Sequence, residues 1–206
     1  MATPYDQRIA RVMVRPLAKA GITPNQVTAL TLVMALAAAW LFARGDAVSA
    51  NWAGGLFVLA RFLDHFDGEL ARLTGTTSRF GYYFDYVTGG ISYAALFLGM
   101  GAGLANGPLG FWAIGLGAAG ALAALLSLGL NLGLDHSLEY TDGTTIGYPG
   151  LGGFELEDGV YLIAPVAWLG WLTPFLVAAG IGASIYCLWT LSRLVRLRRV
   201  PAARDG

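Results

Sequence analysis

Long apolar stretches separated by short polar segments dominate this chain. From about residue 25 onward, windows of roughly twenty mostly apolar residues recur, the length at which a helix crosses the hydrocarbon core of a bilayer. Short polar, glycine- or proline-containing connectors such as "TGTTSR" at 74–79 and "NGP" at 106–108 separate them. The pattern predicts an all-α integral membrane protein with six transmembrane helices. The expected spans are roughly 25–43, 50–73, 80–104, 109–133, 153–172 and 174–193.

The first 22 residues follow a different pattern, in which basic and apolar residues alternate at helical spacing. The basic residues lie three or four positions apart, at Arg8, Arg11, Arg15 and Lys19. This spacing is typical of a basic amphipathic helix on a membrane surface, which we expect to bend at Pro16. No apolar run precedes Ile22, so the sequence indicates no cleavable signal peptide.

Composition supports the membrane assignment. The 206 residues are 56% hydrophobic and only 13% charged, with a mean hydropathy of +0.58, whereas soluble domains carry about 25% charged residues. The net charge is zero, so no nucleic-acid partner is expected, and the single cysteine, Cys187, excludes an intrachain disulfide. Twenty-nine glycines suit closely packed membrane helices and permit a homodimer. We expect one membrane domain over 1–206, consisting of a juxtamembrane helix (1–22), a six-helix bundle (25–196) and a basic tail (197–206).

The placement of basic residues predicts the orientation of the chain in the membrane. Besides the N-terminal group and Arg72 and Arg79 near the 74–79 connector, five arginines gather at the C-terminus: Arg193, Arg196, Arg198, Arg199 and Arg204. With six spans, all of these regions lie on one side, which the positive-inside rule identifies as the cytoplasm. We therefore expect both termini and the 74–79 connector to be cytoplasmic, in a bacterial inner membrane.

A group of acids interrupts the second and third spans: Asp64, Asp67, Glu69 and Asp85. An aspartate costs roughly 2.5–3.5 kcal/mol at the bilayer centre, so such a group needs compensation. Asp64 and Asp67 share a helix face, and the topology brings Asp85 to the same cytoplasmic end. Clustered carboxylates without cysteine suit Mg²⁺ or Mn²⁺, and Mg²⁺ suits a diphosphate substrate. The alternative is that the acids form buried salt bridges with Arg61, Arg72 and Arg79.

The spacing of these residues resembles the signature of the CDP-alcohol phosphotransferases, also called CDP-alcohol phosphatidyltransferases. The matching pattern is Asp64-x2-Asp67-Gly68-x2-Ala71-Arg72-x8-Gly81-x3-Asp85, and "PLAKAGITPNQVT" at 16–28 is similar to the family's entry into the first span. The resemblance implies a six-span enzyme of phospholipid biosynthesis. It also implies that Asp64, Asp67 and Asp85 bind Mg²⁺ (or Mn²⁺), and that the donor contacts Gly68, Ala71, Arg72 and Gly81.

One position departs from the family pattern. The pattern ends with a fourth aspartate, which takes the proton of the attacking hydroxyl, and this chain has Gly89 there. We propose Glu155 and Asp158 as replacements, because they share a face at the start of the fifth span. The alternative is that they have only a structural role, as an acidic first turn that the helix dipole favours. Weaker candidates are His65, Asp135 and His136. The chain is thus either active with a substituted base, slow with an unusual acceptor, or disabled, and we favour the first.

The function expected from this resemblance is a metal-dependent membrane transferase. It would move a phosphatidyl or phospho-alcohol group from a CDP-linked alcohol or lipid to an acceptor hydroxyl and release CMP, with membrane lipids around it. The sequence does not identify the acceptor alcohol. Two alternatives remain: an impaired family member that binds CDP-lipid without turnover, and a small ion- or proton-coupled transporter, since intramembrane acids also mark ion pathways.

Overall fold

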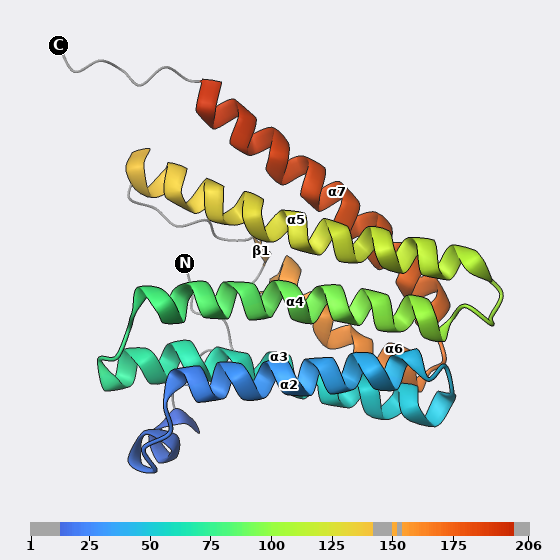
Figure 1. The fold of residues 1–206 in the computed structure, drawn as a ribbon, viewed down its shortest axis with the longest axis horizontal. Coiled ribbons are helices and arrows are strands. Elements are labelled where there is room, and N and C mark those ends of the chain that lie inside the picture. Colours follow the sequence, from blue (N-terminus) through green and yellow to red (C-terminus); the bar gives the residue numbers. More distant parts are fainter. Residues whose placement is uncertain (1–12, 142–149, 152–153, 200–206) are drawn as a thin grey trace.

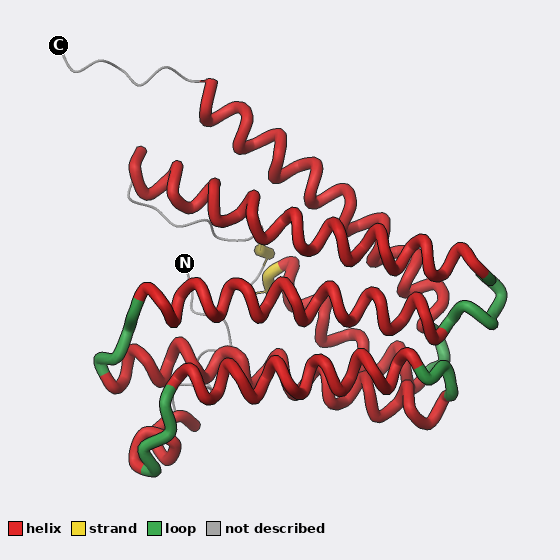
Figure 2. Tube along the Cα trace, viewed as in Figure 1, coloured by secondary structure: helices red, strands yellow, loops and turns green. Residues whose placement is uncertain are grey.

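A computed structural model describes residues 13–141, 150–151 and 154–199, and within them the chain is almost entirely helical (Figures 1 and 2). The segment over residues 13–19 is helical. The long helices that follow are α2 (Pro24–Ala43), α3 (Ala47–Thr74), α4 (Arg79–Gly103), α5 (Phe111–Thr141) and α7 (Leu172–Arg199). Between α5 and α7 lie the paired two-residue strands β1 (Gly150–Leu151) and β2 (Phe154–Glu155), the 3₁₀ helix η1 (Leu156–Leu162) and α6 (Ile163–Trp168).

Local sequence signals set the ends of the first helices. Thr23 and Gln26 form a capping box that starts α2. Asp46 caps α3 by accepting a hydrogen bond from the backbone N–H of Ser49, and the hydrogen bonds from Ser49 lower the pKa of the Asp46 carboxyl. Gly75, with φ +67°, ends α3. Helix α2 packs against both α3 and α4; α3 runs antiparallel to α2, and α4 runs in the same direction as α2 (Figure 1).

Glycines bring helices of the bundle into backbone contact. A Cβ on Gly99 of α4 would clash with the Ala39 carbonyl of α2, and a Cβ on Gly117 of α5 would lie 2.6 Å from the Phe97 carbonyl oxygen of α4. Such small-residue contacts are how membrane helices approach closely. They fix α4 between α2 and α5. The buried core alongside includes Phe57, Met100, Ile163 and Leu176, each no more than 1% exposed.

The membrane-spanning character is clear, but the count of six spans is not confirmed. Three helices of the described part are both long and apolar enough to cross a bilayer: α2, α5 over Phe111–Leu134 and α7 over Leu172–Leu197. The helices α3 and α4 are 28 and 25 residues long, and α3 carries the charged groups. The expected fifth span, 153–172, is not one helix, because β2, η1 and α6 occupy it and its apolar helical part is only Gly159–Trp168. The apolar helix is short because acidic residues precede Gly159 and because the chain turns at Gly170, with φ +72°.

The described end of the N-terminal helix is amphipathic and packs on the bundle. Val14 is 1% exposed and belongs to a cluster with Val27, Phe66 and Leu70 of α2 and α3, whereas Arg15 and the other basic residue of this part, Lys19, are exposed. The beginning of the expected surface helix, with Arg8 and Arg11, lies outside the described residues, as does the tail from residue 200. The position of this helix on a membrane surface stays a prediction.

Five of the six tryptophans, together with Phe111, lie exposed at one end of the bundle. They belong to the C-terminal end of α2, the N-terminal ends of α3 and α5, and the turn between α6 and α7, which lie together at the right of Figure 1. The residues are Trp40, Trp52, Phe111, Trp112, Trp168 and Trp171, each more than 60% exposed. Tryptophan is enriched where membrane helices meet the interface, so this end fits a membrane–water boundary.

Candidate active site

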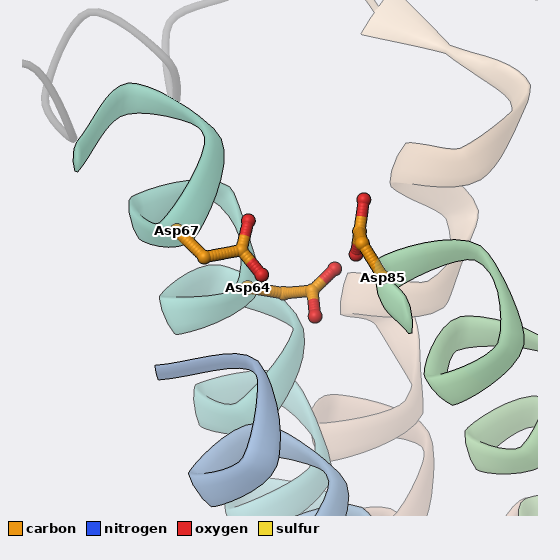
Figure 3. A group of neighbouring side chains, drawn as sticks. All are labelled: Asp64, Asp67 and Asp85. Carbon is orange, nitrogen blue, oxygen red and sulfur yellow. The ribbon is translucent and has the colours of Figure 1, made fainter. Parts of the chain in front are cut away.

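Three carboxylates from two helices converge away from the aromatic end. Asp64 and Asp67 project from α3 and Asp85 from α4, and one carboxylate oxygen of each lies within 4.8 Å of the other two. Figure 3 shows the three side chains directed toward a common space between the helices. Oxygen ligands bind Mg²⁺ at about 2.1 Å and Ca²⁺ at about 2.3–2.6 Å, so small side-chain adjustments would let all three bind one cation. The residues therefore fit a hard divalent metal.

Two threonines of α2 orient the acids of α3. The Thr28 hydroxyl donates a hydrogen bond to Asp67 Oδ2, and Thr31 Oγ1 lies 3.2 Å from Asp64 Oδ1 as a donor. Asp67 is 6% exposed, so an unbonded carboxylate there would be costly. Sequence reasoning missed both residues. Their only signal was two hydroxyls three positions apart at the start of an apolar span.

An arginine of α3 forms a salt bridge with Asp64 of the same helix. Arg61 Nη1 lies 2.9 Å from Asp64 Oδ2, and its guanidinium lies over the Tyr93 ring of α4, 5.0 Å from the ring centre. Arg72 pairs instead with Glu69 at 2.8 Å. The salt-bridge alternative therefore accounts for Glu69 and part of the environment of Asp64. It does not account for the convergence of three carboxylates.

The acids open into a large cavity inside the bundle. The cavity has a volume of about 730 Å³ and is lined by residues of α3, α4, α5, η1 and α7. Along α4 its lining extends from Asp85 to Met100, about 22 Å at the rise of an α-helix. Charged groups line it where the acids lie, and apolar side chains such as Phe97 and Phe175 line the rest. This distribution suits an amphiphile with an anionic head.

The structure separates the four residues expected to contact the donor. Gly68 and Arg72 line the cavity, and a Cβ on Gly68 would lie 3.4 Å from an Arg72 guanidinium nitrogen, so the glycine makes room for that side chain. Ala71 and Gly81 are absent from the lining. A Cβ on Gly81 would lie 3.4 Å from Oδ1 of Asn25. Gly81 therefore allows the start of α4 to pack closely against the start of α2.

Gly89 faces the same cavity as the acids. It lies one helical turn after Asp85, and a Cβ added there would meet no atom within 4 Å. His65 also lines the cavity, and its Nδ1 lies 3.0 Å from the Arg61 carbonyl oxygen. A carbonyl can only accept, so Nδ1 is the donor of this hydrogen bond.

For the acids proposed as substitute bases, Glu155 and Asp158, the structure describes only the backbone. Glu155 ends β2 and Asp158 lies in η1, so the expectation that they share one face at the start of a membrane helix is wrong. Their side chains are outside the described residues. The next residues, Gly159 and Val160, line the cavity, so η1 runs past the site. The side chains of the weaker candidates on α5, Asp135 and His136, are also outside the described part.

Removing the hydroxyl that bonds Asp67 is expected to weaken metal binding without unfolding the protein. Thr28→Val keeps the side-chain shape, and loss of such an orienting partner typically lowers metal affinity 10–100-fold. Mn²⁺ titration followed by electron paramagnetic resonance measures the change. Thr190→Val is the matched control, because Thr190 is equally buried and its hydroxyl bonds the Tyr186 carbonyl of its own helix. Equal Mn²⁺ affinities for the two variants would contradict the prediction.

Comparison with known proteins identifies the group to which this arrangement belongs. The sequence profile of CDP-alcohol phosphatidyltransferase matches residues 21–140, more than half of the chain. The chain belongs to the CDP-alcohol phosphatidyltransferase family. The matched range contains Asp64, Asp67 and Asp85 and both threonines that position the acids. The family assignment made from the sequence is therefore confirmed.

The chain is similar to a curated relative over part of its length. The chain is 36% identical over 89 residues to archaetidylinositol phosphate synthase of Pyrococcus horikoshii, a match that spans 43% of this chain and 46% of the relative. The chain thus matches about half the length of that relative.

Solved structures share the whole fold of this chain. The Mycobacterium tuberculosis phosphatidylinositol phosphate synthase with CDP-DAG bound is 24% identical, with a TM-score of 0.57 and coverage of 97% of this chain and 98% of that one. The same enzyme with manganese and citrate is 23% identical, with a TM-score of 0.55 and coverage of 96% and 92%. At this identity the likeness establishes a common fold, and it extends through the region after residue 140 that the family profile does not match.

Proposed function

We propose that this protein is a metal-dependent phospholipid-biosynthetic transferase that moves a phosphatidyl or phospho-alcohol group from a CDP-linked lipid to an acceptor hydroxyl. The observation that carries the proposal is the cluster of Asp64, Asp67 and Asp85 at the polar part of an amphiphile-sized cavity, in a member of this family. A solved structure of the same fold has CDP-DAG bound, and another has manganese. We favour Mg²⁺ as the ion in this chain.

The chain's own residues would position the donor for in-line displacement. Asp64, Asp67 and Asp85 would hold the ion, which when bound neutralises the diphosphate and polarises the bond to CMP. Arg72 would contact a phosphate through its planar fork of donors, in the space that Gly68 leaves open. The acceptor oxygen would form a bond to phosphorus while the bond between phosphorus and the CMP oxygen breaks.

The proton of the acceptor hydroxyl needs a receiving group near position 89. Glu155 or Asp158 is the base that we propose, because the segment that carries them continues directly into the cavity lining at Gly159. His65 is the alternative, through its Nε2. Glu155→Gln, Asp158→Asn and His65→Gln, compared by the pH dependence of CMP release, would separate these groups.

The orientation that we propose places the acids and both termini on the cytoplasmic side of a bacterial inner membrane. The support is the separation of five exposed tryptophans at one end of the bundle, all except Trp189, from Arg72, Arg79, Arg193 and Arg196 toward the other. This distribution matches the positive-inside rule.

The direct test is CMP release by the reconstituted protein with CDP-diacylglycerol, Mg²⁺ and a panel of acceptor alcohols. We expect release only when both metal and an acceptor are present. A second candidate function, binding without turnover, is favoured by Gly89 alone. Saturable CDP-diacylglycerol binding with no CMP from any acceptor would support it, and cation flux in vesicles without CMP release would support a transporter.

A further inference from the structure

A second polar group lies in the cavity on helices that carry none of the three acids. Ser127 and Asn131 of α5 and Tyr186 of α7 all line the cavity. The two α5 residues are 8% and 9% exposed, so each is more than nine-tenths buried. The Tyr186 hydroxyl donates a hydrogen bond to Asn131 Oδ1 at 3.3 Å. Together they form what we call the amide–phenol wall, defined by Ser127, Asn131 and Tyr186.

Two members of the amide–phenol wall, Ser127 and Asn131, have hydrogen-bonding capacity to spare. Within the described residues, the structure gives no hydrogen bond to the Asn131 amide nitrogen or to the Ser127 hydroxyl. Neither atom is among the fully enclosed side-chain atoms of the described residues that lack a partner, so both are accessible from the cavity that their residues line. Apolar packing alone gives no reason for an amide here. A polar ligand in the cavity would supply those partners.

The charges around the cavity limit what that ligand can be. In the described part of the chain, the cationic residues of the lining are Arg61 and Arg72, both on α3 and both paired with carboxylates of the same helix. The segment 135–158, which follows α5, contains no lysine or arginine. Arg193 of α7 does not line the cavity, and its guanidinium lies over the Trp189 ring, 5.0 Å from the ring centre. Among the residues whose side chains the structure describes, those that α5 and α7 contribute to the cavity lining are therefore uncharged.

We infer that the amide–phenol wall binds the acceptor substrate, and that this acceptor is an uncharged, hydroxyl-bearing alcohol without a phosphate group. The inference rests on the proposed transferase function. An amide and a phenol can both donate to and accept from hydroxyls. A phosphate monoester carries about two negative charges at neutral pH and would need cationic partners that this wall lacks. The relatives described above are named as synthases of inositol phosphate lipids, so a neutral acceptor would set this chain apart from them.

The placement of the wall also fits the chemistry. The acids and the amide–phenol wall line one continuous cavity from different helices. A donor held by the acids and an acceptor held by Asn131 and Tyr186 would thus share one space, with the acceptor hydroxyl free to approach the phosphorus. Binding energy spent on positioning two substrates accounts for much of the acceleration in such transfers.

The test compares matched acceptors that differ by one phosphate: glycerol with glycerol 3-phosphate, and myo-inositol with myo-inositol 1-phosphate. The reconstituted protein is assayed for CMP release with CDP-diacylglycerol and Mg²⁺, and acceptor binding is measured separately by saturation-transfer NMR. We expect kcat/KM for a neutral acceptor to exceed that of its phosphorylated partner at least tenfold. A faster reaction with the phosphorylated partner would overturn the inference.

Variants of the wall separate acceptor binding from all other steps. Asn131→Leu is expected to raise the acceptor KM roughly 10-fold or more and to leave the donor KM and Mn²⁺ affinity unchanged. Tyr186→Phe, which keeps the ring, is expected to show the same pattern more weakly and covers the case in which the first variant fails to fold. Ser184→Ala is the control, because the Ser184 hydroxyl bonds the Gly180 carbonyl of its own helix and lies outside the cavity lining.

The NMR arm keeps this inference distinct from the proposed function. Neutral-alcohol binding that disappears in Asn131→Leu, without CMP release by any protein, would overturn the transferase function and support the wall as an alcohol site. Acceptor binding and KM that are the same in wild type, Asn131→Leu and Tyr186→Phe would overturn the wall as the acceptor site, whatever the activity.

Discussion

Replacing Asp67 with asparagine is expected to reduce CMP release about 1,000-fold, on the order of 4 kcal/mol of transition-state stabilisation. The amide keeps the shape of the carboxylate and an oxygen that can accept the hydrogen bond from Thr28. It removes the negative charge that a divalent ion needs at this buried position. CMP release at saturating metal and Mn²⁺ binding by electron paramagnetic resonance measure the two consequences, and both should fall together.

The matched control for this change is Asp46→Asn. Asp46 is an acid of the same chain that caps the other end of α3, and asparagine is an equally good helix cap. The control should keep wild-type CMP release and metal affinity. An Asp67→Asn variant that retained more than a tenth of the activity, with unchanged Mn²⁺ affinity, would show that Asp67 serves the packing of α2 against α3 and not the chemistry.

Introducing an aspartate at position 89 is expected to raise Mn²⁺ affinity roughly 100-fold, equivalent to about 2.7 kcal/mol. The new carboxylate would lie one turn from Asp85 on the face of α4 that lines the cavity. The space for its Cβ is open, and aspartate is at least as compatible with a helix interior as glycine. A fourth carboxylate near a divalent ion supplies the added attraction.

Gly90→Asp is the control that makes this result interpretable. The neighbouring position adds the same charge, but its Cβ would lie 2.9 Å from Leu128 Cδ2 of α5. We expect this variant to lower the melting temperature and to leave metal affinity at or below the wild-type level. Equal Mn²⁺ affinities in wild type and Gly89→Asp would show that position 89 does not face the ion.

Much of the first half of the fold follows from local sequence signals. The spans expected at 25–43, 50–73 and 80–104 correspond to α2, α3 and α4, because caps and a C-terminal glycine mark their ends within a few residues. The prediction of one helix over 153–172 was wrong, because hydropathy alone does not reveal where a chain turns. The acids before Gly159 and the left-handed turn at Gly170 break that segment.

The site was predictable where it depends on spacing within one helix. Asp64 and Asp67 share a face by their spacing, and the short connection to α4 brings Asp85 beside them. Thr28 and Asn131 could not be found this way, because neither shares a helix or a spacing pattern with the acids. Their importance comes from side chains that reach them from other helices, and that information lies in the tertiary packing.

The hydrogen bonds to the acids have a practical consequence for handling the protein. Asp64 and Asp67 already have partners in Arg61, Thr31 and Thr28 without any ion. Small zinc domains, by contrast, unfold without their metal because binding and folding are one event. Here we expect chelation to abolish activity reversibly while the helical bundle stays folded. Protein stripped of metal with EDTA can then be stored, loaded with a chosen cation and assayed with each cation in turn.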